Sequence, residues 1–311
     1  MGRGVKLAAA FLLAAGALHA TTFYVTVAGL GGEPDYEQRF SMWAGEIEAI
    51  LKSAGDGAKI ETLKGPAATR ANVRSALAKI AGEAKPDDSL VVMLIGHGTF
   101  DGFDYKINLP GPDLSGSELA SLLDRVPAAR QLVVDMTSAS GGAINALRRE
   151  NRVVIAATKS GTERNATVFP RFWIEALRDP AADTDKNETI SVLEAFHYAQ
   201  QKTAEYYESQ KRLATEHPLI EDTGRGEGVR DPSPANREGL RAAAFPLVRL
   251  GATNTIANTP EKKKLLAQKD QLEQQIDLLK YNKATLAPDE YKKKLSALLL
   301  DLAKTQQELD Q

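Results

Sequence analysis

The sequence predicts an α/β protein with a mainly parallel, doubly wound sheet that has helices on both faces, followed by a C-terminal helical hairpin or coiled coil. Between residues 21 and 158, apolar runs bounded by glycine and polar residues alternate with stretches of helical periodicity, as in parallel sheets with crossover helices. The runs Val91–Ile95 and Gln131–Asp135 are continuously apolar in the middle, which is typical of strands covered on both faces. From Pro260 onward the chain becomes rich in Lys, Gln, Glu and Leu and has no glycine.

Composition excludes several classes of function. The chain has 311 residues and a formal net charge of −2, so there is no basic surplus of the kind that nucleic-acid binding requires. It has no cysteine, which excludes disulfides, a thiolate nucleophile and cysteine-ligated metals. We therefore expect no nucleic-acid partner and no chemistry that depends on a cysteine thiol.

Residues 1–20 have the features of a secretory signal peptide. Arg3 and Lys6 are followed by an apolar run that ends in small residues, and cleavage after Ala17 or Ala20 is expected. The alternative is an uncleaved membrane anchor, for which the apolar run is short. The mature protein is therefore expected to be secreted or periplasmic.

Residues 21–213 are expected to form the α/β domain. The predicted strands lie at 21–30, 59–63, 91–95, 131–135 and 152–158. The predicted helices lie at 36–54, 69–84, 117–126, 143–149 and 191–213. A short hairpin is expected at 103–109. Residues 214–259 are expected to be an extended linker and packing segment, with a long surface loop followed by a final strand or extended stretch at 242–250.

Polar clusters follow two of the predicted strands. His97, Gly98 and Asp101 come after the first, and Ser138 comes after the second. Because ligands of open α/β sheets bind beyond the carboxyl ends of parallel strands, these residues are expected to lie at one edge of the sheet.

A strand that ends in His-Gly, an Asp-Gly pair shortly after, and a second strand with a Ser-Gly pair beyond its end resemble the caspase/legumain clan of cysteine peptidases, most closely its legumain side. The resemblance covers residues 21–213 and implies that His97 is the general base and that the Gly98 amide is an oxyanion donor. It places the nucleophile at Ser138, where the clan has cysteine. It also assigns Glu163, in the loop after the strand at 152–158, to the substrate pocket, and Asp101 is placed there as well.

Replacement of sulfur by oxygen leaves three hypotheses open. The first is a catalytically impaired peptidase homologue that uses the cleft to bind a peptide or protein. The second is an active hydrolase in which Ser138 is the nucleophile and His97 its base, which demands a well-oriented histidine. The third is a plain α/β domain with no surviving site.

Residues 183–194 match the spacing of an EF-hand calcium loop, because hard cations need six or seven oxygens arranged around one point. The expected ligands are Asp183, Asp185, Asn187, the carbonyl of Thr189, Ser191 and Glu194. Glu188 departs from the pattern, since it occupies the position where the loop normally has glycine. The alternative is an acidic turn that caps a helix.

Residues 260–311 carry leucines at helical spacing in two stretches separated near Pro288, which predicts a helical hairpin or short coiled coil. We expect this segment to dock on a protein partner, on a second copy of the chain, or on the α/β domain.

Overall fold

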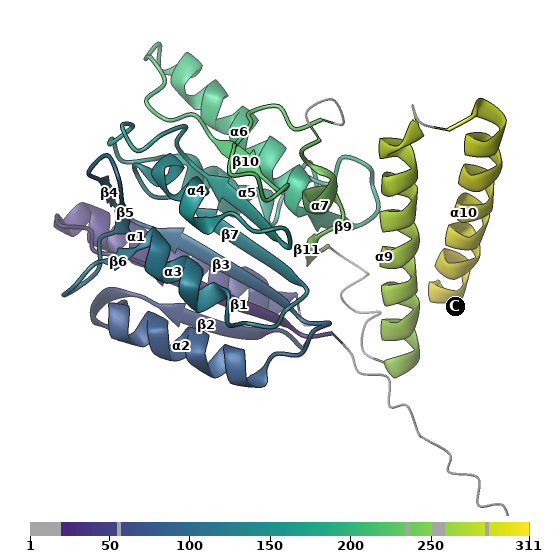
Figure 1. Ribbon diagram of the computed structural model, residues 1–311, viewed down its shortest axis with the longest axis horizontal. Helices are drawn as coiled ribbons and strands as arrows, with labels where there is room; N and C mark the ends of the chain where they lie inside the picture. The colour runs from purple at the N-terminus through teal and green to yellow at the C-terminus, as the bar shows by residue number, and fades with distance from the viewer. Residues whose placement is uncertain (1–19, 55–56, 234–236, 251–258, 284–285, 311) are drawn as a thin grey trace, which may run out of the picture.

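The computed structural model describes residues 20–54, 57–233, 237–250, 259–283 and 286–310, so the expected signal peptide lies outside the described residues except for Ala20. The centre is a six-stranded sheet in the order β10-β8-β7-β3-β1-β2 (Figure 1). Its strands are β1 (Thr22–Ala28), β2 (Lys59–Leu63), β3 (Ser89–Ile95), β7 (Arg130–Asp135), β8 (Arg152–Ala156) and β10 (Leu219–Glu221). The first five are parallel to their neighbours and β10 is antiparallel, which confirms the predicted mainly parallel sheet.

Helices cover both faces of the sheet. One face carries α1 (Pro34–Ser53), α5 (Phe169–Ala176) and α6 (Val192–Ser209), and the other carries α2 (Arg70–Glu83), α3 (Gly116–Leu123) and α4 (Ile144–Leu147). All seven residues of β3 are buried, because alternate side chains enter the two cores. Thr69 and Ser115 cap the starts of α2 and α3, where each side chain accepts a hydrogen bond from a backbone amide of the first turn, so α3 begins one residue before the predicted 117.

The register of the central strands determines where the candidate site lies. β3 and β7 pair in parallel, with Leu94 opposite Asp135. Their carboxyl ends are therefore adjacent, and the segments that begin at Gly96 and Met136 leave the same edge of the sheet together. This is the arrangement that the sequence predicted for His97 and Ser138.

Two small sheets flank the main one. The strands β4 (Gly98–Phe100), β5 (Tyr105–Ile107) and β6 (Leu114–Ser115) extend the expected hairpin, and β9 (Thr189–Ser191) pairs with β11 (Pro246–Arg249). The prediction of a surface loop after residue 217 is wrong for β10, which pairs with β8 at the edge of the main sheet. β10 has only three residues, and the glycines and proline around it suggested a loop, so burial against β8 outweighed the local turn signals.

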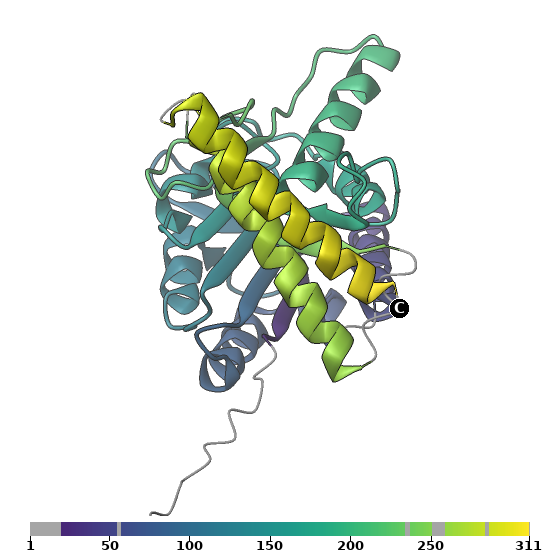
Figure 2. The ribbon, with the colours of Figure 1, turned by 90° about the vertical axis from the view of Figure 1, so that its right-hand side faces the viewer.

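The C-terminal segment forms the expected helical hairpin. It consists of α9 (Pro260–Tyr281) and α10 (Pro288–Leu309), with α9 next to the domain, through α7 (Leu240–Ala243), and α10 outermost (Figures 1 and 2). Among the described residues, no helix is both long enough and apolar enough to cross a membrane.

Candidate functional site

His97 lies just beyond β3, with its ring against helix α1. The ring centroid is 4.9 Å from that of Tyr36 and 5.2 Å from that of Phe40, and both contacts are edge-on. Burial lowers the pKa of His97, and this is partly offset by a hydrogen bond to the Gly31 backbone and by the charge of Glu33. The imidazole is therefore neutral at pH 7, the form that a general base requires.

Ser138 lies beyond β7 and is 1% exposed. Its Oγ accepts a hydrogen bond from the Gly98 amide at 3.0 Å and donates one to the Gly98 carbonyl at 3.2 Å. Gly98 permits this approach, because a Cβ at that position would lie 2.3 Å from the Ser138 carbonyl oxygen. The hydroxyl and the amide expected as nucleophile and oxyanion donor thus bond to each other, and no hydrogen bond joins Ser138 to His97 in the described part of the chain.

A buried polar network lies beneath Ser138. The Thr137 hydroxyl donates to Asp135 at 2.7 Å and also bonds the Tyr105 hydroxyl at 2.6 Å. Burial raises the pKa of Asp135 to about 6, although the hydrogen bonds from Thr137 and Tyr105 lower it. None of these three residues was predicted from the sequence, where the only signal for them is a carboxylate at the end of an otherwise apolar strand.

The two residues that were expected to line a substrate pocket, Asp101 and Glu163, have different roles in the structure. Asp101 is exposed, and its carboxylate accepts hydrogen bonds from the Phe103 and Asp104 amides within its own turn. Those bonds lower the pKa of Asp101. This carboxylate therefore organises its own turn.

Glu163 lies close to the Ser138 segment through its backbone, since its carbonyl accepts a hydrogen bond from the Ala139 amide at 2.7 Å. Its carboxylate binds the Lys159 amide and both the amide and the Nδ1 of His217, the latter at 2.5 Å. His217, for which the sequence predicted no role, is thereby fixed next to the loop that follows β8. Nearby Glu216 is buried, and this burial raises its pKa to about 7.

The 183–194 loop brings its expected carboxylates together. One oxygen each of Asp183, Asp185 and Glu194 lies within 4.8 Å of the others. The Asp183 carboxylate accepts the Asn187 and Glu188 amides, which curls the loop around it. Three converging carboxylates suit a hard divalent cation, whereas the side-chain oxygen of Asn187, another expected ligand, accepts the Thr189 amide at 2.8 Å.

Two of the expected calcium ligands, Ser191 and Glu194, also cap the N-terminus of helix α6. Ser191 is the N-cap of α6 and forms a capping box with Glu194, whose carboxylate accepts the Ser191 amide and hydroxyl. Thr189 and Ser191 lie on β9, which pairs with β11. β11 lies within the stretch 242–250 that was expected to be a strand or extended, but its pairing with β9 was not predicted from the sequence.

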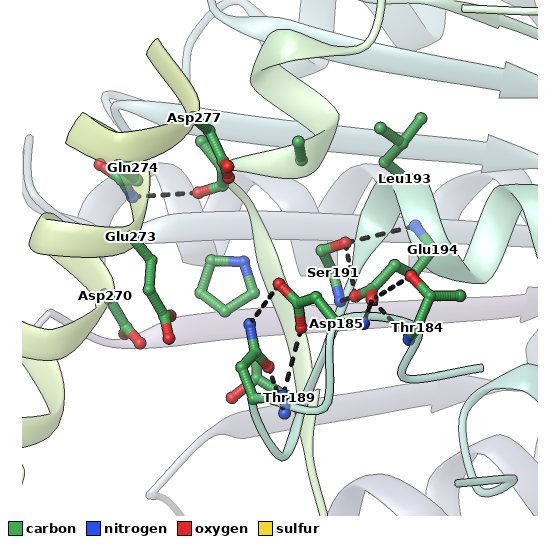
Figure 3. A pocket seen from close by; sticks show the side chains of 14 residues that line it. Thr184, Asp185, Thr189, Ser191, Leu193, Glu194, Asp270, Glu273, Gln274 and Asp277 are labelled. Carbon is green, nitrogen blue, oxygen red and sulfur yellow. Dashed lines mark hydrogen bonds between the residues drawn. The ribbon is translucent and has the colours of Figure 1, made fainter. Parts of the chain in front are cut away.

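The loop also faces helix α9 across a cavity of about 170 Å³ (Figure 3). Asp270, Glu273 and Asp277 of α9 line this cavity opposite Asp185 and Glu194. Burial is the largest cause of the raised pKa of Asp185, about 6, and of Glu273, about 7. The Lys269 ammonium, which is buried, donates to the Asn187 carbonyl at 2.8 Å and ties the helix to the loop.

No family model and no curated protein matches the sequence. Solved structures with a similar backbone arrangement include a structural-genomics protein of Geobacter sulfurreducens. Its sequence identity is 14% and the TM-score is 0.44, over 71% of this chain and 97% of that one. The Drosophila initiator caspase Dronc is similar over 68% of this chain and 82% of its own, with 8% identity and a TM-score of 0.43. Caspase-1 of Spodoptera frugiperda is similar over 66% of this chain and 88% of its own, with 12% identity and a TM-score of 0.43.

Proposed function

We propose that this chain is an exported protein of the caspase/legumain type that lacks peptidase activity and binds a peptide or protein at the carboxyl edge of its sheet. The observation that carries the proposal is the pairing of the Ser138 hydroxyl with both backbone groups of Gly98. A nucleophile needs a base within hydrogen-bond reach, and His97 is held against Tyr36 and Phe40 instead.

The chemistry of oxygen supports the same conclusion. A thiol with a pKa of about 8.5 is partly ionised near neutral pH, whereas a serine hydroxyl depends on a base that is oriented for it. Here the Gly98 amide already donates to Ser138, so it is not free to stabilise an oxyanion elsewhere. A serine enzyme at this site would have to break both contacts before reacting.

The candidate contact for a bound partner is an exposed aromatic side chain on the turn that follows β4. Phe103 is 97% exposed at the turn between β4 and β5, and the Asp101 carboxylate fixes the backbone of that turn. Aromatic residues, Phe among them, are enriched in the buried cores of protein interfaces, so Phe103 is the side chain that we expect a partner to cover.

The test uses the mature protein with a mixed peptide library, beside the variants Ser138→Ala and Phe103→Ser. We expect no cleavage by any of the three proteins, together with peptide binding that Phe103→Ser weakens and Ser138→Ala preserves. Cleavage that Ser138→Ala abolishes, or covalent labelling of Ser138 by a fluorophosphonate probe, would instead establish the alternative, an active hydrolase with a Ser138–His97 pair.

Export is tested separately. N-terminal sequencing of the secreted protein should give Leu18 or Thr21 as the first residue.

We also propose that the 183–194 loop binds Ca²⁺, because Asp183, Asp185 and Glu194 converge within 4.8 Å. Isothermal titration with CaCl₂ should give one binding event, which Asp183→Asn removes. Asp101→Asn is the matched control, since it neutralises an exposed carboxylate that caps a different turn. Equal heats from all three proteins would show that the loop is only a helix cap.

A further inference from the structure

The outer helix α10 presents a second apolar stripe that the hairpin itself does not cover. Its inner face packs on α9 through leucines and through buried Thr305 and Leu309. Beside that face lie Leu295, which is half-buried, and Leu299, which is 48% exposed. Ala303, four residues after Leu299, continues the stripe because residues four apart lie on one side of a helix. Figure 2 shows α10 as the outermost element, with α9 between it and the domain.

Charged residues of opposite sign mark the two ends of this stripe. Lys292 lies seven residues before Leu299, and Asp310, the C-cap of α10, lies seven residues after Ala303. Both are exposed, and neither takes part in an ion pair among the described residues. By contrast, Lys294 and Lys304 are paired within the helix to Glu290 and Asp301. The stripe is therefore positive at its start, apolar at Leu299 and Ala303, and negative at its end, where Gln306 donates to the Asp310 carboxylate at 2.8 Å.

We propose that α10 pairs with α10 of a second copy of this chain in antiparallel orientation, giving a homodimer through a four-helix arrangement of two hairpins. In an antiparallel pair centred near residue 301, Lys292 of each copy faces Asp310 of the other. Leu299 then faces Ala303, so a large side chain meets a small one across the contact. Opposite charges at both ends fix the orientation and the register of the pair.

Neighbouring Leu300 provides an internal control. It is 58% exposed, yet it points about 100° away from Leu299, toward a surface of Lys293, Ser296 and Gln307. Association of two chains should therefore depend on Leu299 and not on the adjacent, exposed Leu300.

The experiment is sedimentation equilibrium of the full mature chain over a range of concentrations. We expect a monomer–dimer equilibrium whose dissociation constant rises at least about tenfold in Leu299→Glu and stays within about twofold in Leu300→Glu. Lys292→Asp and Asp310→Lys should each weaken the dimer, and the double variant should restore it, because each altered residue then meets its opposite in the second copy. Circular dichroism of each variant checks that the helices remain folded.

Three results would overturn the proposal. A monomer at every concentration would remove the dimer altogether. Equal effects of Leu299→Glu and Leu300→Glu would place the contact elsewhere. A charge-reversed double variant that stays as weak as its single variants would show that Lys292 and Asp310 do not meet, as expected if the stripe served a different protein. Peptide binding at the sheet edge is measured separately, so neither result determines the other.

Discussion

At the scale of single residues, backbone contacts decide what the candidate site can do. Ser138 follows the strand and reaches the position that a nucleophile would occupy, but its hydroxyl bonds the Gly98 amide and carbonyl. His97 is neutral and half-buried against aromatic rings. The two side chains that define the expected dyad are thus both engaged elsewhere.

A thiol introduced at position 138 should not create a peptidase. We expect Ser138→Cys to show no peptide cleavage above background, because His97 remains held by Tyr36, Phe40 and the Gly31 backbone. The measurement is cleavage of the mixed peptide library together with the rate of thiol alkylation across a pH range of about 5 to 9. Library cleavage, or a thiol pKa well below the usual value of about 8.5, would show that His97 does activate this position.

Asp135 should make stability depend on pH. Its pKa is about 6 in the folded protein against an ordinary value of 3.8, so the folded state holds the proton more tightly. The contribution is fully present below about pH 4 and is lost as pH rises through about 6, by about 3 kcal/mol in order of magnitude. Urea unfolding at about pH 4 and about pH 7.5 should therefore show a larger loss for the wild type than for Asp135→Asn. Equal losses in both proteins would refute this role for Asp135.

At the scale of elements, the 183–194 loop combines a ligand set with backbone strain. Lys186 and Glu188 have φ values of 60° and 65°, in the left-handed region that favours glycine. Hydrogen bonds from the Asn187 and Glu188 amides to Asp183, and the β9–β11 pairing, keep the loop in this conformation. The strain at Glu188 is what its departure from the usual glycine predicts.

Glu188→Gly should relieve that strain. We expect the free energy of unfolding to increase by about 1 kcal/mol without calcium, since a left-handed φ costs a non-glycine residue about that much. Calcium affinity should increase as well, because the loop would be closer to its bound backbone. Chemical denaturation measures the first effect and calorimetric titration the second. Glu188→Ala is the control, because it keeps the Cβ and should show no gain in stability.

At the scale of the whole molecule, the hairpin docks on the domain through a polar face. Arg249 of β11 forms a 2.6 Å ion pair with Asp270 of α9, and both side chains are mostly buried. Gln274 donates to the Ala244 carbonyl at 3.0 Å, and Lys269 donates to Asn187. Polar interfaces of this kind are typical of units that can separate, whereas α9 and α10 hold each other through leucines.

Asp270→Asn should loosen this docking. The change leaves Arg249 without its carboxylate partner in a mostly buried position, beside Arg130, and such a loss costs about 3 kcal/mol. Hydrogen exchange of α9 amides should become faster while exchange of β3 amides is unchanged. Asp277→Asn is the matched control: Asp277 has a raised pKa from burial, so its neutralisation should leave exchange the same or slower. Faster exchange in the control variant would contradict this view of the interface.

Much of the fold followed from local patterns. β2 matches its predicted bounds, and α2 and α3 begin within one residue of the predicted helix starts at 69 and 117. Strong periodicity over many residues leaves few alternatives, so these elements could be predicted. β9 and β10 could not, since each has only three residues and gains its stability from a partner strand far away in the sequence.

The order and chemistry of the residues were enough to show that His97 and Ser138 follow neighbouring strands, that cysteine is absent and that three loop carboxylates have calcium-like spacing. Three other properties became visible only in the folded chain: Ser138 bonds Gly98, Glu163 binds His217, and α9 lines the acidic cavity. The physical reason is that hydrogen bonds and cavities depend on small distances between segments that are far apart in the chain, and no local pattern encodes those distances.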